Sequence, residues 1–565
     1  MIIDLNGDGR LTIEAPARLS DVIARIPGLR AERGTDRWVG AATPALLFAV
    51  ATELSGVQGF APTDAVVAAM RGHAAQRAVV QGLKDGAAAR HDERLFDFQH
   101  AGVDMLLRGG CLLGDEMGTG KTVMALTAAR QCRGATLVVS PNSMKHRWVR
   151  EAETWYPEAR TFVVEGTAKQ KQRVLEDALL SQQMGEPVLV SVNWESLRTL
   201  SRLAGYGSTK RSAKEQEAGP LNLLTWTTVI ADEAHRAKDP KAKQTRALWA
   251  VGQNVPYCWA LTGTPVLNTP GDLWAIGRFY DPDTYTDGRH KWHNRFIDSI
   301  DTQWGPKDLG MRRDRTPEFN AWFDLRFLRR TKDEVLDLPP VTYQTRELEL
   351  TAKQSAAYNR MVKDMIVAVE GGILLATDPL ALLTRLSQIA SATPVVDDMD
   401  VVGLDLPSNK VNALLEILDE GDGQVAVFAQ SRKLIELAEG ELNRKGIDNV
   451  SVTGRVSAAQ RDINVQRFQE GGARVALCTL GAGSEGINLF AADTAVFLQR
   501  SYAYGQNQQA ESRVHRQGQT RPVTNIDLVS AGTIDVDVIA ALSSKAGMSE
   551  QVLRDQARQL LSRRT

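Results

Sequence analysis

CLLGDEMGTGKTVMALTAAR, residues 111–130, joins a short apolar run to a glycine-rich turn and then to a helical pattern. A strand, a turn and a helix start in this order direct several backbone N–H groups at one point, and the helix dipole adds positive potential there. Glycines allow the main chain to approach a bound phosphate closely. The sequence therefore predicts a phosphate-binding loop over residues 114–122, called the phosphate loop below.

Two side chains at the end of the phosphate loop carry the chemistry that a nucleoside triphosphate requires. Lys121 is placed to reach the β and γ phosphates, and the Thr122 hydroxyl to bind Mg²⁺. The strict motif begins with glycine, but Asp115 stands at that position. A chance glycine turn is the alternative interpretation. The loop residues expected to hold the nucleotide are Asp115, Glu116, Met117, Gly118, Thr119, Gly120, Lys121 and Thr122.

Two adjacent acids follow the apolar run TTVI, residues 227–230. A carboxylate at a strand end facing the phosphate loop can hold Mg²⁺ through water, and a second one can orient and deprotonate the attacking water. We expect Asp232 in the first role and Glu233 in the second. The alternative is a solvated acidic loop, which the position of the pair on a different predicted strand from Lys121 argues against.

QQAESRVHRQGQ, residues 508–519, places two arginines near the end of the chain. Arg513 and Arg516 are spaced three apart and are predicted to share one helix face. They are solvated surface arginines in the alternative interpretation. An arginine from a facing lobe can stabilise the charge on a transferring phosphoryl group, with an effect of about 10³ to 10⁵ in rate, and makes hydrolysis conditional on closure.

The order of apolar runs predicts the fold class. From about residue 95, short apolar runs alternate with amphipathic stretches; the pattern breaks over residues 280–340 and returns from about residue 424. Strands alternating with helices form parallel βαβ units. We therefore predict an α/β protein with two RecA-like parallel-sheet lobes, a helical insertion between them and a small N-terminal α+β domain. The expected bounds are 1–90 for the N-terminal domain, 91–280 for lobe 1, 281–400 for the insertion and connector, 401–545 for lobe 2 and 546–565 for a basic tail.

Composition bounds the class of protein. Of 565 residues, 43% are apolar and 24% charged, and the formal net charge is -1. No stretch approaches the run of about 20 apolar residues that crosses a bilayer, so no membrane partner is expected. Attraction to nucleic acid has to come from local clusters of Lys and Arg. The widely spaced cysteines lack zinc-site spacing and are expected to be reduced thiols of a cytoplasmic protein; they are Cys111, Cys132, Cys258 and Cys478.

These blocks, in this order from about residue 95 to residue 519, resemble a helicase superfamily two ATPase of the Swi/Snf type. FLRRTKDEVLDLPP, residues 327–340, is similar to the basic brace and connector between the lobes and is the most subgroup-specific block. The resemblance implies ATP and Mg²⁺ as cofactors and translocation along double-stranded DNA without strand separation. It assigns Gln99 to the adenine side and Gly486 to the nucleotide. The residues to which it gives a coupling role are His235, Thr262, Gly263, Thr264 and Gln509.

The same resemblance suggests DNA contacts at strand ends of both lobes. Phosphate contacts fix register without reading sequence, so little sequence preference is expected. Ahead of GINL, many relatives carry a basic residue and a further glycine, where this chain has Gly481, Ser484 and Glu485, so one phosphate or coupling contact can differ. Trp148 is interpreted as a core residue. The candidate DNA-binding residues are Ser143, Lys145, Arg147, Asn193, Arg455 and Thr479.

The first ninety residues have another character. DLNGDGRLTIE, residues 4–14, predicts a hairpin at Asp8-Gly9, since Glu14 falls one place short of the last ligand of a calcium loop. IARIPGLRAERGTDRW, residues 23–38, faintly resembles the small DNA-binding module of the HepA-related annealing helicases. A packing domain without DNA contact is the alternative.

The leading functional hypothesis is an ATP-dependent translocase on double-stranded DNA that remodels protein–DNA complexes or branched DNA. One alternative is a strand-separating helicase of the same superfamily. Another is a nucleic-acid-binding scaffold with an inert nucleotide site. The compact form favours a protein of the bacterial cytoplasm, or a viral protein in a bacterial host.

Overall fold

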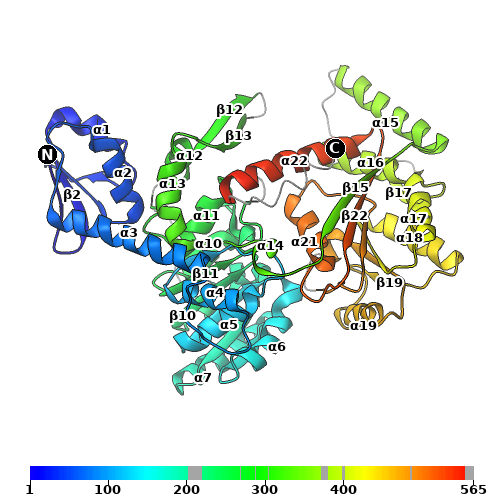
Figure 1. The fold of residues 1–565 in the computed structure, drawn as a ribbon, viewed down its shortest axis with the longest axis horizontal. Coiled ribbons are helices and arrows are strands. Elements are labelled where there is room, and N and C mark those ends of the chain that lie inside the picture. Colours follow the sequence, from blue (N-terminus) through cyan, green and yellow to red (C-terminus); the bar gives the residue numbers. More distant parts are fainter. Residues whose placement is uncertain are drawn as a thin grey trace. The chain divides into compact units, whose positions relative to one another are not determined.

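The computed structural model describes residues 1–201, 219–266, 269–286, 288–302, 305–370, 379–396, 401–483 and 487–553. The chain forms two compact units. Unit 1 comprises Met1–Thr331 with Gln551–Leu553, and unit 2 begins at Lys332. Figure 1 follows the chain through both. The Gly-, Ser- and Lys-containing stretch of residues 201–220 is predicted from its sequence to be a surface loop. Most of this stretch, and most of the basic tail expected over residues 546–565, lie outside the described residues.

The N-terminal domain is a small α+β unit with its own hydrophobic core. Its strands pair in the order β3-β4-β2-β1-β5. The hairpin expected at Asp8-Gly9 is confirmed by β1 and β2, which pair antiparallel around a turn in which Asn6 Oδ1 accepts from the Arg10 N–H at 2.8 Å. The elements are β1 (Ile2–Leu5), β2 (Arg10–Glu14), α1 (Ser20–Ala24), β3 (Arg30–Ala31), β4 (Arg37–Ala41), α2 (Pro44–Leu54), β5 (Ala61–Pro62) and α3 (Asp64–Lys84).

Lobe 1 is a seven-stranded parallel sheet in the order β14-β6-β11-β10-β7-β9-β8. Its central strands are mostly apolar and buried, because both faces of the sheet are covered, each by a separate core. The strands are β6 (Cys111–Leu113), β7 (Ala135–Ser140), β8 (Arg160–Val163), β9 (Val188–Asn193), β10 (Trp226–Asp232), β11 (Tyr257–Leu261) and β14 (Phe327–Leu328). The helices are α4 (Asp97–Leu107), α5 (Lys121–Cys132), α6 (Lys145–Trp155), α7 (Ala168–Gln183), α8 (Trp194–Leu200), α10 (Lys243–Val251) and α11 (Asp272–Tyr280).

The insertion after lobe 1 contains an antiparallel hairpin as well as the expected helices. Its elements within unit 1 are α12 (Arg289–Phe296), β12 (Ile297–Thr302), β13 (Gly305–Met311) and α13 (Thr316–Phe323). α13 packs against α2 of the N-terminal domain. Glu53 on α2 accepts from Arg315 at 2.6 Å and from Arg295 at 3.2 Å, so ion pairs join the N-terminal domain to the insertion.

Lobe 2, in unit 2, is a six-stranded parallel sheet in the order β15-β22-β21-β18-β20-β19, with a core on each face. The two sheets confirm the α/β class with two RecA-like lobes. The strands are β15 (Val341–Leu348), β16 (Thr393–Val396), β17 (Val401–Asp405), β18 (Val425–Ala429), β19 (Asn449–Val452), β20 (Val475–Thr479), β21 (Thr494–Phe497) and β22 (Val523–Ser530), of which β16 and β17 form a separate hairpin. The helices are α14 (Lys332–Val335), α15 (Ala352–Glu370), α16 (Pro379–Ser391), α17 (Asn409–Glu420), α18 (Arg432–Arg444), α19 (Ala458–Gln469), α20 (Leu480–Gly483), α21 (Tyr504–Val514) and α22 (Ile534–Leu553).

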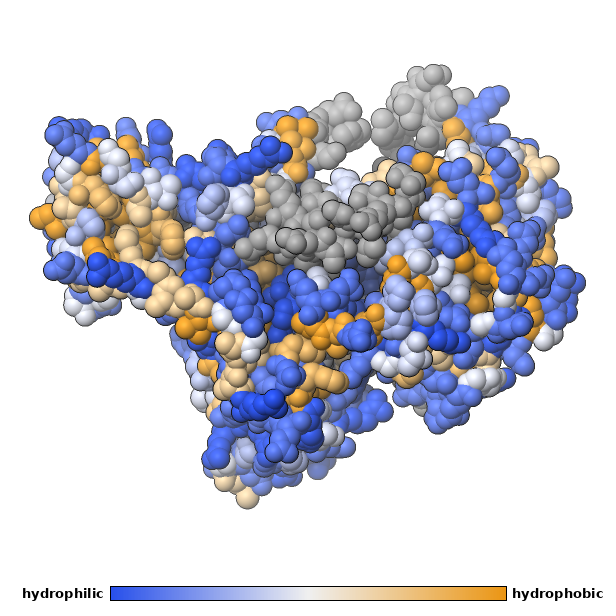
Figure 2. All heavy atoms as spheres, in the orientation of Figure 1, coloured by the Kyte–Doolittle hydropathy of each residue, from blue (hydrophilic) through white to orange (hydrophobic). Residues whose placement is uncertain are grey.

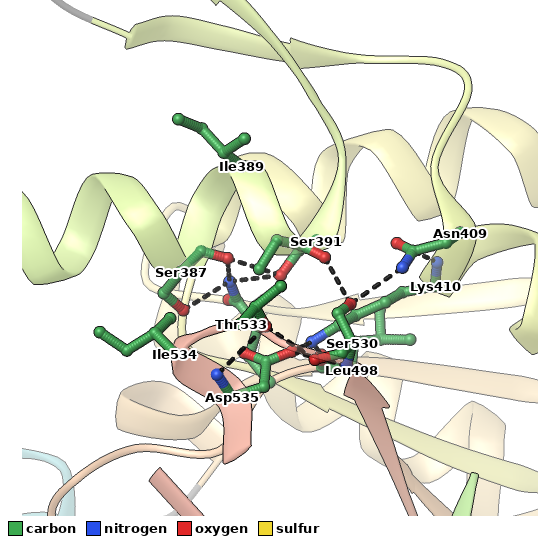
Figure 3. A network of polar contacts seen from close by, with 12 residues as sticks. Ser387, Ile389, Ser391, Asn409, Lys410, Leu498, Ser530, Thr533, Ile534 and Asp535 are labelled. Carbon is green, nitrogen blue, oxygen red and sulfur yellow. Dashed lines mark hydrogen bonds and ion pairs between the residues drawn. The ribbon is translucent and has the colours of Figure 1, made fainter. Parts of the chain in front are cut away.

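A buried polar network ties helices α16, α17 and α22 to the ends of the lobe 2 strands (Figure 3). Lys410 is fully buried, and its Nζ donates to Leu498 O at 2.7 Å and to Asp535 Oδ2 at 2.5 Å. Ser530 Oγ donates to the main chain of α16 at Ala390. A buried charge requires such partners, so the network fixes how these helices pack on the sheet.

The outer surface is mainly polar. On the face seen in Figure 2, apolar residues lie in small groups between hydrophilic ones. Among the described residues, no helix is both long enough and apolar enough to cross a bilayer. The four cysteines are free thiols, as expected, and burial raises the pKa of Cys111, Cys258 and Cys478 to about 12.

Candidate active site

The phosphate loop lies between the end of β6 and the start of α5, as the sequence predicts. Gly118 and Gly120 adopt φ values of 87° and 89°, in the left-handed region that favours glycine. A Cβ on Gly120 would stand 2.3 Å from Gln99 Nε2, so a larger residue would displace this amide as well as strain the backbone. The loop therefore has the glycine geometry that its sequence requires.

Gln99 holds the phosphate loop through its side-chain amide. It is buried on α4, accepts from the Phe96 N–H at 3.0 Å and donates through Nε2 to Thr119 O at 3.0 Å. These contacts fix the start of α4 against the loop. Its expected place on the adenine side stays a prediction.

Lys121 points back over its own loop. Its Nζ donates to Asp115 O at 2.7 Å and to Glu116 O at 3.1 Å. Burial lowers the pKa of Lys121, and the negative charges of Glu233, Asp115 and Asp232 act in the opposite direction. The structure therefore brings Lys121 and the acidic pair into one electrostatic environment. A nucleotide phosphate could take the place of the two carbonyl oxygens.

Two indoles hold the acidic strand end. Trp148 Nε1 donates to Asp232 Oδ2 at 2.9 Å, and Trp194 Nε1 donates to Asp232 O at 3.0 Å. Burial and the nearby charge of Glu233 raise the pKa of Asp232, while the Trp148 hydrogen bond lowers it. Trp148 is fully buried, in agreement with its interpretation as a core residue, but no pattern in the sequence indicates its contact with Asp232.

Glu233, the second residue of the acidic pair, is connected to the coupling triplet, residues 262–264. The backbone φ of Glu233 is 52°, which is unusual for a residue with a side chain and costs about 1–3 kcal/mol. His235 Nδ1 lies 3.3 Å from Glu233 Oε2 and 3.0 Å from Thr262 Oγ1. Thr262 Oγ1 accepts from the Thr264 N–H at 3.1 Å. His235 therefore connects the strand ends of β10 and β11.

The coupling triplet also contacts the phosphate loop. The Thr262 N–H donates to Leu113 O at 3.2 Å, directly before the loop. A Cβ on Gly263 would stand 2.6 Å from Met117 Cγ, so glycine is required for this approach. Of the predicted residues in unit 1, the structure thus brings together the phosphate loop, the acidic pair, His235 and the triplet.

Asp115, at the position of the missing glycine, is paired with an arginine that the sequence did not reveal. Asp115 is fully buried; Oδ1 accepts from Arg330 Nε at 3.1 Å and from the Arg330 N–H at 3.0 Å, and Oδ2 accepts from Nη2. One bidentate guanidinium contact and one main-chain N–H leave this carboxylate occupied by protein. Its predicted contact with nucleotide is therefore through the main chain.

The arginines lie in unit 2, and one expectation about them is wrong. α21 ends at Val514, so Arg516 lies beyond the helix and does not share a helix face with Arg513. The chain leaves the helix at His515, whose carbonyl accepts from Lys332 Nζ at 2.6 Å. Arg513 donates to Ile487 O at 3.5 Å.

Three further predictions concern the same unit. Arg516 Nη1 donates to Asn488 Oδ1, next to the residue that binds Arg513. Gln509 is buried on α21. Gly486 lies outside the described residues. Because Lys121 belongs to unit 1, the encounter of the arginines with its nucleotide stays a prediction.

The candidate DNA contacts differ in exposure. Ser143 is exposed, whereas Lys145 is buried with its Nζ 3.4 Å from Val164 O and 3.6 Å from Glu165 Oε2. Thr479 is half-buried at the end of β20. The other candidates contact carboxylates: Arg147 pairs with Glu151 at 3.5 Å, Asn193 with Glu195 at 2.7 Å and Arg455 with Glu436 at 3.1 Å.

The residues of the acidic strand end and the phosphate loop fit a Mg²⁺ site in which a bound substrate supplies further ligands. Among the described residues, no group of three His, Cys, Asp or Glu side chains could by itself enclose a metal. Mg²⁺ is usually bound through one or two carboxylates, water and substrate phosphates, not in a protein cage. Asp232 and the half-buried Thr122 hydroxyl supply oxygens of the right kind.

A glycine-rich phosphate loop after β6, an acidic pair at the end of β10 in the same parallel sheet, and a second parallel-sheet lobe define a two-lobed nucleotide-binding protein. The SNF2-related domain matches residues 76–394, and the helicase conserved C-terminal domain matches residues 409–518. The chain belongs to the SNF2-related family of helicase-like ATPases, which confirms the resemblance found in its sequence.

Curated relatives include chromodomain-helicase-DNA-binding protein 8 of Xenopus tropicalis, 26% identical over 82% of this chain and 22% of the relative. Chromodomain-helicase-DNA-binding protein 1-like of Danio rerio is 26% identical over 79% of this chain and 42% of the relative. The chain thus spans less than half the length of these relatives. Among solved structures, the Sulfolobus solfataricus SWI2/SNF2 ATPase core in complex with dsDNA matches with 22% identity, 84% of this chain, 97% of that chain and a TM-score of 0.35.

Proposed function

We propose that the chain is a DNA-dependent ATPase that moves along double-stranded DNA and remodels protein–DNA complexes or branched DNA. One observation carries the ATPase part. The acidic pair, His235 and the coupling triplet are joined by contacts that reach the start of the phosphate loop in unit 1. Lys121 binds carbonyl groups of the same loop, where the charges of the acidic pair act on its pKa. Membership of the SNF2-related family supports the part that concerns DNA.

The groups of this set, together with Thr122 and the two arginines of unit 2, are assigned roles in hydrolysis. Lys121 neutralises charge on the β and γ phosphates, and loop N–H groups orient them. Thr122 and Asp232, the latter through water, would hold Mg²⁺, and the bound ion would shield phosphate charge. Glu233 orients the attacking water and accepts its proton. Arg513 and Arg516 stabilise the charge that develops on the transferring group.

The contacts of His235 give hydrolysis a route to the rest of lobe 1. His235 contacts both Glu233 and Thr262, so a shift of Glu233 on proton transfer alters the coupling triplet. The triplet in turn abuts the loop at Met117. The proposed DNA contacts follow strand ends of the two sheets, where such shifts can move them.

A DNA-stimulated ATPase assay across single-stranded, duplex and forked DNA tests the proposal. We expect stimulation by duplex DNA, displacement of a third strand from a triplex and no unwinding of a plain fork. Unwinding of the fork would support a strand-separating helicase instead. Turnover that DNA does not stimulate, or no turnover at all, would overturn the proposal and leave a nucleic-acid-binding scaffold.

The five-part division of the chain stays part of this proposal, with one difference at the expected insertion and connector: its strands β14 and β15 pair with the sheets of lobe 1 and lobe 2. The N-terminal domain is proposed as an accessory to DNA binding. It presents the Pro27–Gly28 turn, with Gly28 at a φ of 85°, ahead of β4, which carries Trp38.

A further inference from the structure

Two consecutive arginines fasten the chain after β14 to the phosphate loop. Arg330 binds the buried Asp115, and its guanidinium lies 5.3 Å from the centre of the Phe98 ring. Arg329 donates to Gly114 O and, at 3.1 Å, to Gly263 O. The main chain adds a hydrogen bond from the Glu116 N–H to Arg330 O at 2.9 Å. Every one of these contacts lies within unit 1.

Two residues further along, a lysine fastens the same chain to the arginine segment, residues 513–519. Lys332 is 3% exposed, and its Nζ donates to His515 O at 2.6 Å. His515 Nε2 also lies 2.9 Å from Pro339 O, in the connector. These contacts lie within unit 2, which begins at Lys332. His515 stands in the sequence between the two candidate arginines.

We propose that residues 329–332 form a linking segment that makes the position of the arginine segment depend on the state of the phosphate loop. Arg330 acts as a positioning residue through Asp115, and Lys332 acts as one through the His515 carbonyl. The inference rests on the proposed ATPase function and deepens it, because it names a covalent route between the phosphate loop and the arginine segment.

The physical basis is that the linking segment is too short to absorb a displacement of one of its anchored residues. Only Thr331 separates the two anchored residues, and two residues of chain span at most about 7 Å. The Arg330–Asp115 pair is buried, where losing one partner leaves an uncompensated charge, so the pair resists separation. Lys332 donates a charge-assisted hydrogen bond to a carbonyl in a similarly dry place. A shift of the phosphate loop on binding phosphate is therefore passed on and is not absorbed locally.

Lys332→Met tests the unit 2 anchor, since it keeps the length of the side chain and removes the donor. We expect kcat to fall about 10- to 100-fold, the scale of a small misplacement of catalytic groups, with an unchanged Kd for a fluorescent ATP analogue. Rates are counted per titrated nucleotide site, so that loss of folded protein does not imitate the effect. Lys332→Arg, which retains donors, should recover part of the rate.

Lys545→Met is the matched control. Lys545 Nζ also donates to a main-chain carbonyl in unit 2, that of Tyr502 at 2.7 Å, but lies outside the linking segment. It should keep the parent kcat. The inference is overturned if Lys332→Met retains the parent kcat, or if kcat, nucleotide affinity and melting temperature fall together in the two lysine variants.

Hydrogen exchange tests the link itself and does not need hydrolysis. In the parent, adding a non-hydrolysable ATP analogue should slow exchange in the arginine segment. In Asp115→Asn, saturated with the same analogue, this change should be lost because the Arg330 anchor is weakened. An unchanged response in Asp115→Asn would overturn the link. Absence of DNA-stimulated turnover in the parent would instead overturn the proposed function, so the two failures are distinguishable.

Discussion

The acidic strand end in unit 1 and the arginines in unit 2 are both held by buried or half-buried polar contacts, but by different kinds of partner. Asp232 is fixed by two indole N–H groups on rigid side chains. Arg513 and Arg516 donate to a main-chain carbonyl and an amide oxygen, at Ile487 and Asn488. Phosphate oxygens can replace such acceptors, whereas the two indole donors belong to fully buried tryptophans that packing holds in place.

The difference separates a fixed part of the proposed site from a part that can exchange partners. Asp232 has to keep one position for a metal ion through each cycle, so rigid aromatic donors suit it. The arginines are required only when charge develops on the phosphoryl group. The helix α21, which carries Arg513 and ends just before Arg516, is nevertheless held firmly. Arg500 is buried and pairs with Glu511 on α21 and with Asp527 on β22. A change of partner by the two arginines would therefore involve the ends of their side chains.

Arg516→Ala should give the largest effect on the rate of hydrolysis. It tests the arginines, the part of the proposed site that can exchange partners. We expect kcat to fall about 10³- to 10⁵-fold with ATP binding largely intact, since the side chain acts on developing charge. Single-turnover hydrolysis together with nucleotide titration checks both quantities. Turnover at the parent rate would show that Arg516 does not stabilise the charge on the transferring phosphoryl group.

Glu233→Gln should nearly abolish hydrolysis in the fixed part. The loss of a general base lowers the rate about 10²- to 10⁴-fold, and nucleotide should still bind, because glutamine keeps the shape of the side chain. Lys121→Ala, in contrast, should lose both hydrolysis and nucleotide affinity. Steady-state ATPase rates and binding titrations separate the two variants, and equal affinities in both would contradict the assigned roles.

Trp148→Phe asks whether the fixed part depends on its indole donor. Phenylalanine retains the apolar ring and loses the N–H that Asp232 Oδ2 accepts. The Mg²⁺ concentration for half-maximal rate should rise about 10- to 100-fold, as for loss of a group that orients a metal ligand. Trp194→Phe is the matched control, because Trp194 contacts only the main chain of Asp232. Equal shifts in both variants would count against the role of the carboxylate contact.

Glu53→Gln tests a contact outside both regions and should give the smallest effect on activity, with an unchanged ATPase rate. Burial would raise the pKa of Glu53, but Arg315 and Arg295 lower it below the usual 4.5. The ion pair therefore contributes stability above the unfolded pKa, and that stability is lost as the pH falls through the lowered folded pKa. We expect a loss of about 1–3 kcal/mol near neutral pH.

Thermal melts of parent and Glu53→Gln at a series of pH values check this expectation. The difference between them should shrink on acidification, since glutamine does not titrate. A constant difference at all pH values would show that the carboxylate charge is irrelevant to the contact.

Local chemistry made much of the fold and the phosphate loop predictable. Gly118 and Gly120 indicate a turn with left-handed backbone angles, and TTVI before the acidic pair predicts a buried parallel strand. These signals come from neighbours in the sequence. The end of α21 at Val514 was not predictable in this way, because RVHRQ continues a helical pattern and the His515 contacts come from the distant Lys332 and Pro339.

The sequence by itself determined the class of protein, the alternation of strands and helices, and which residue types could carry phosphate chemistry. Only the tertiary structure decided that Trp148 donates to Asp232, that Arg330 occupies Asp115, and that Arg516 leaves the helix. The physical reason is that periodicity and glycine geometry are short-range properties of the chain. A buried carboxylate, in contrast, is satisfied by whichever donor the packing brings to it, at any distance along the sequence.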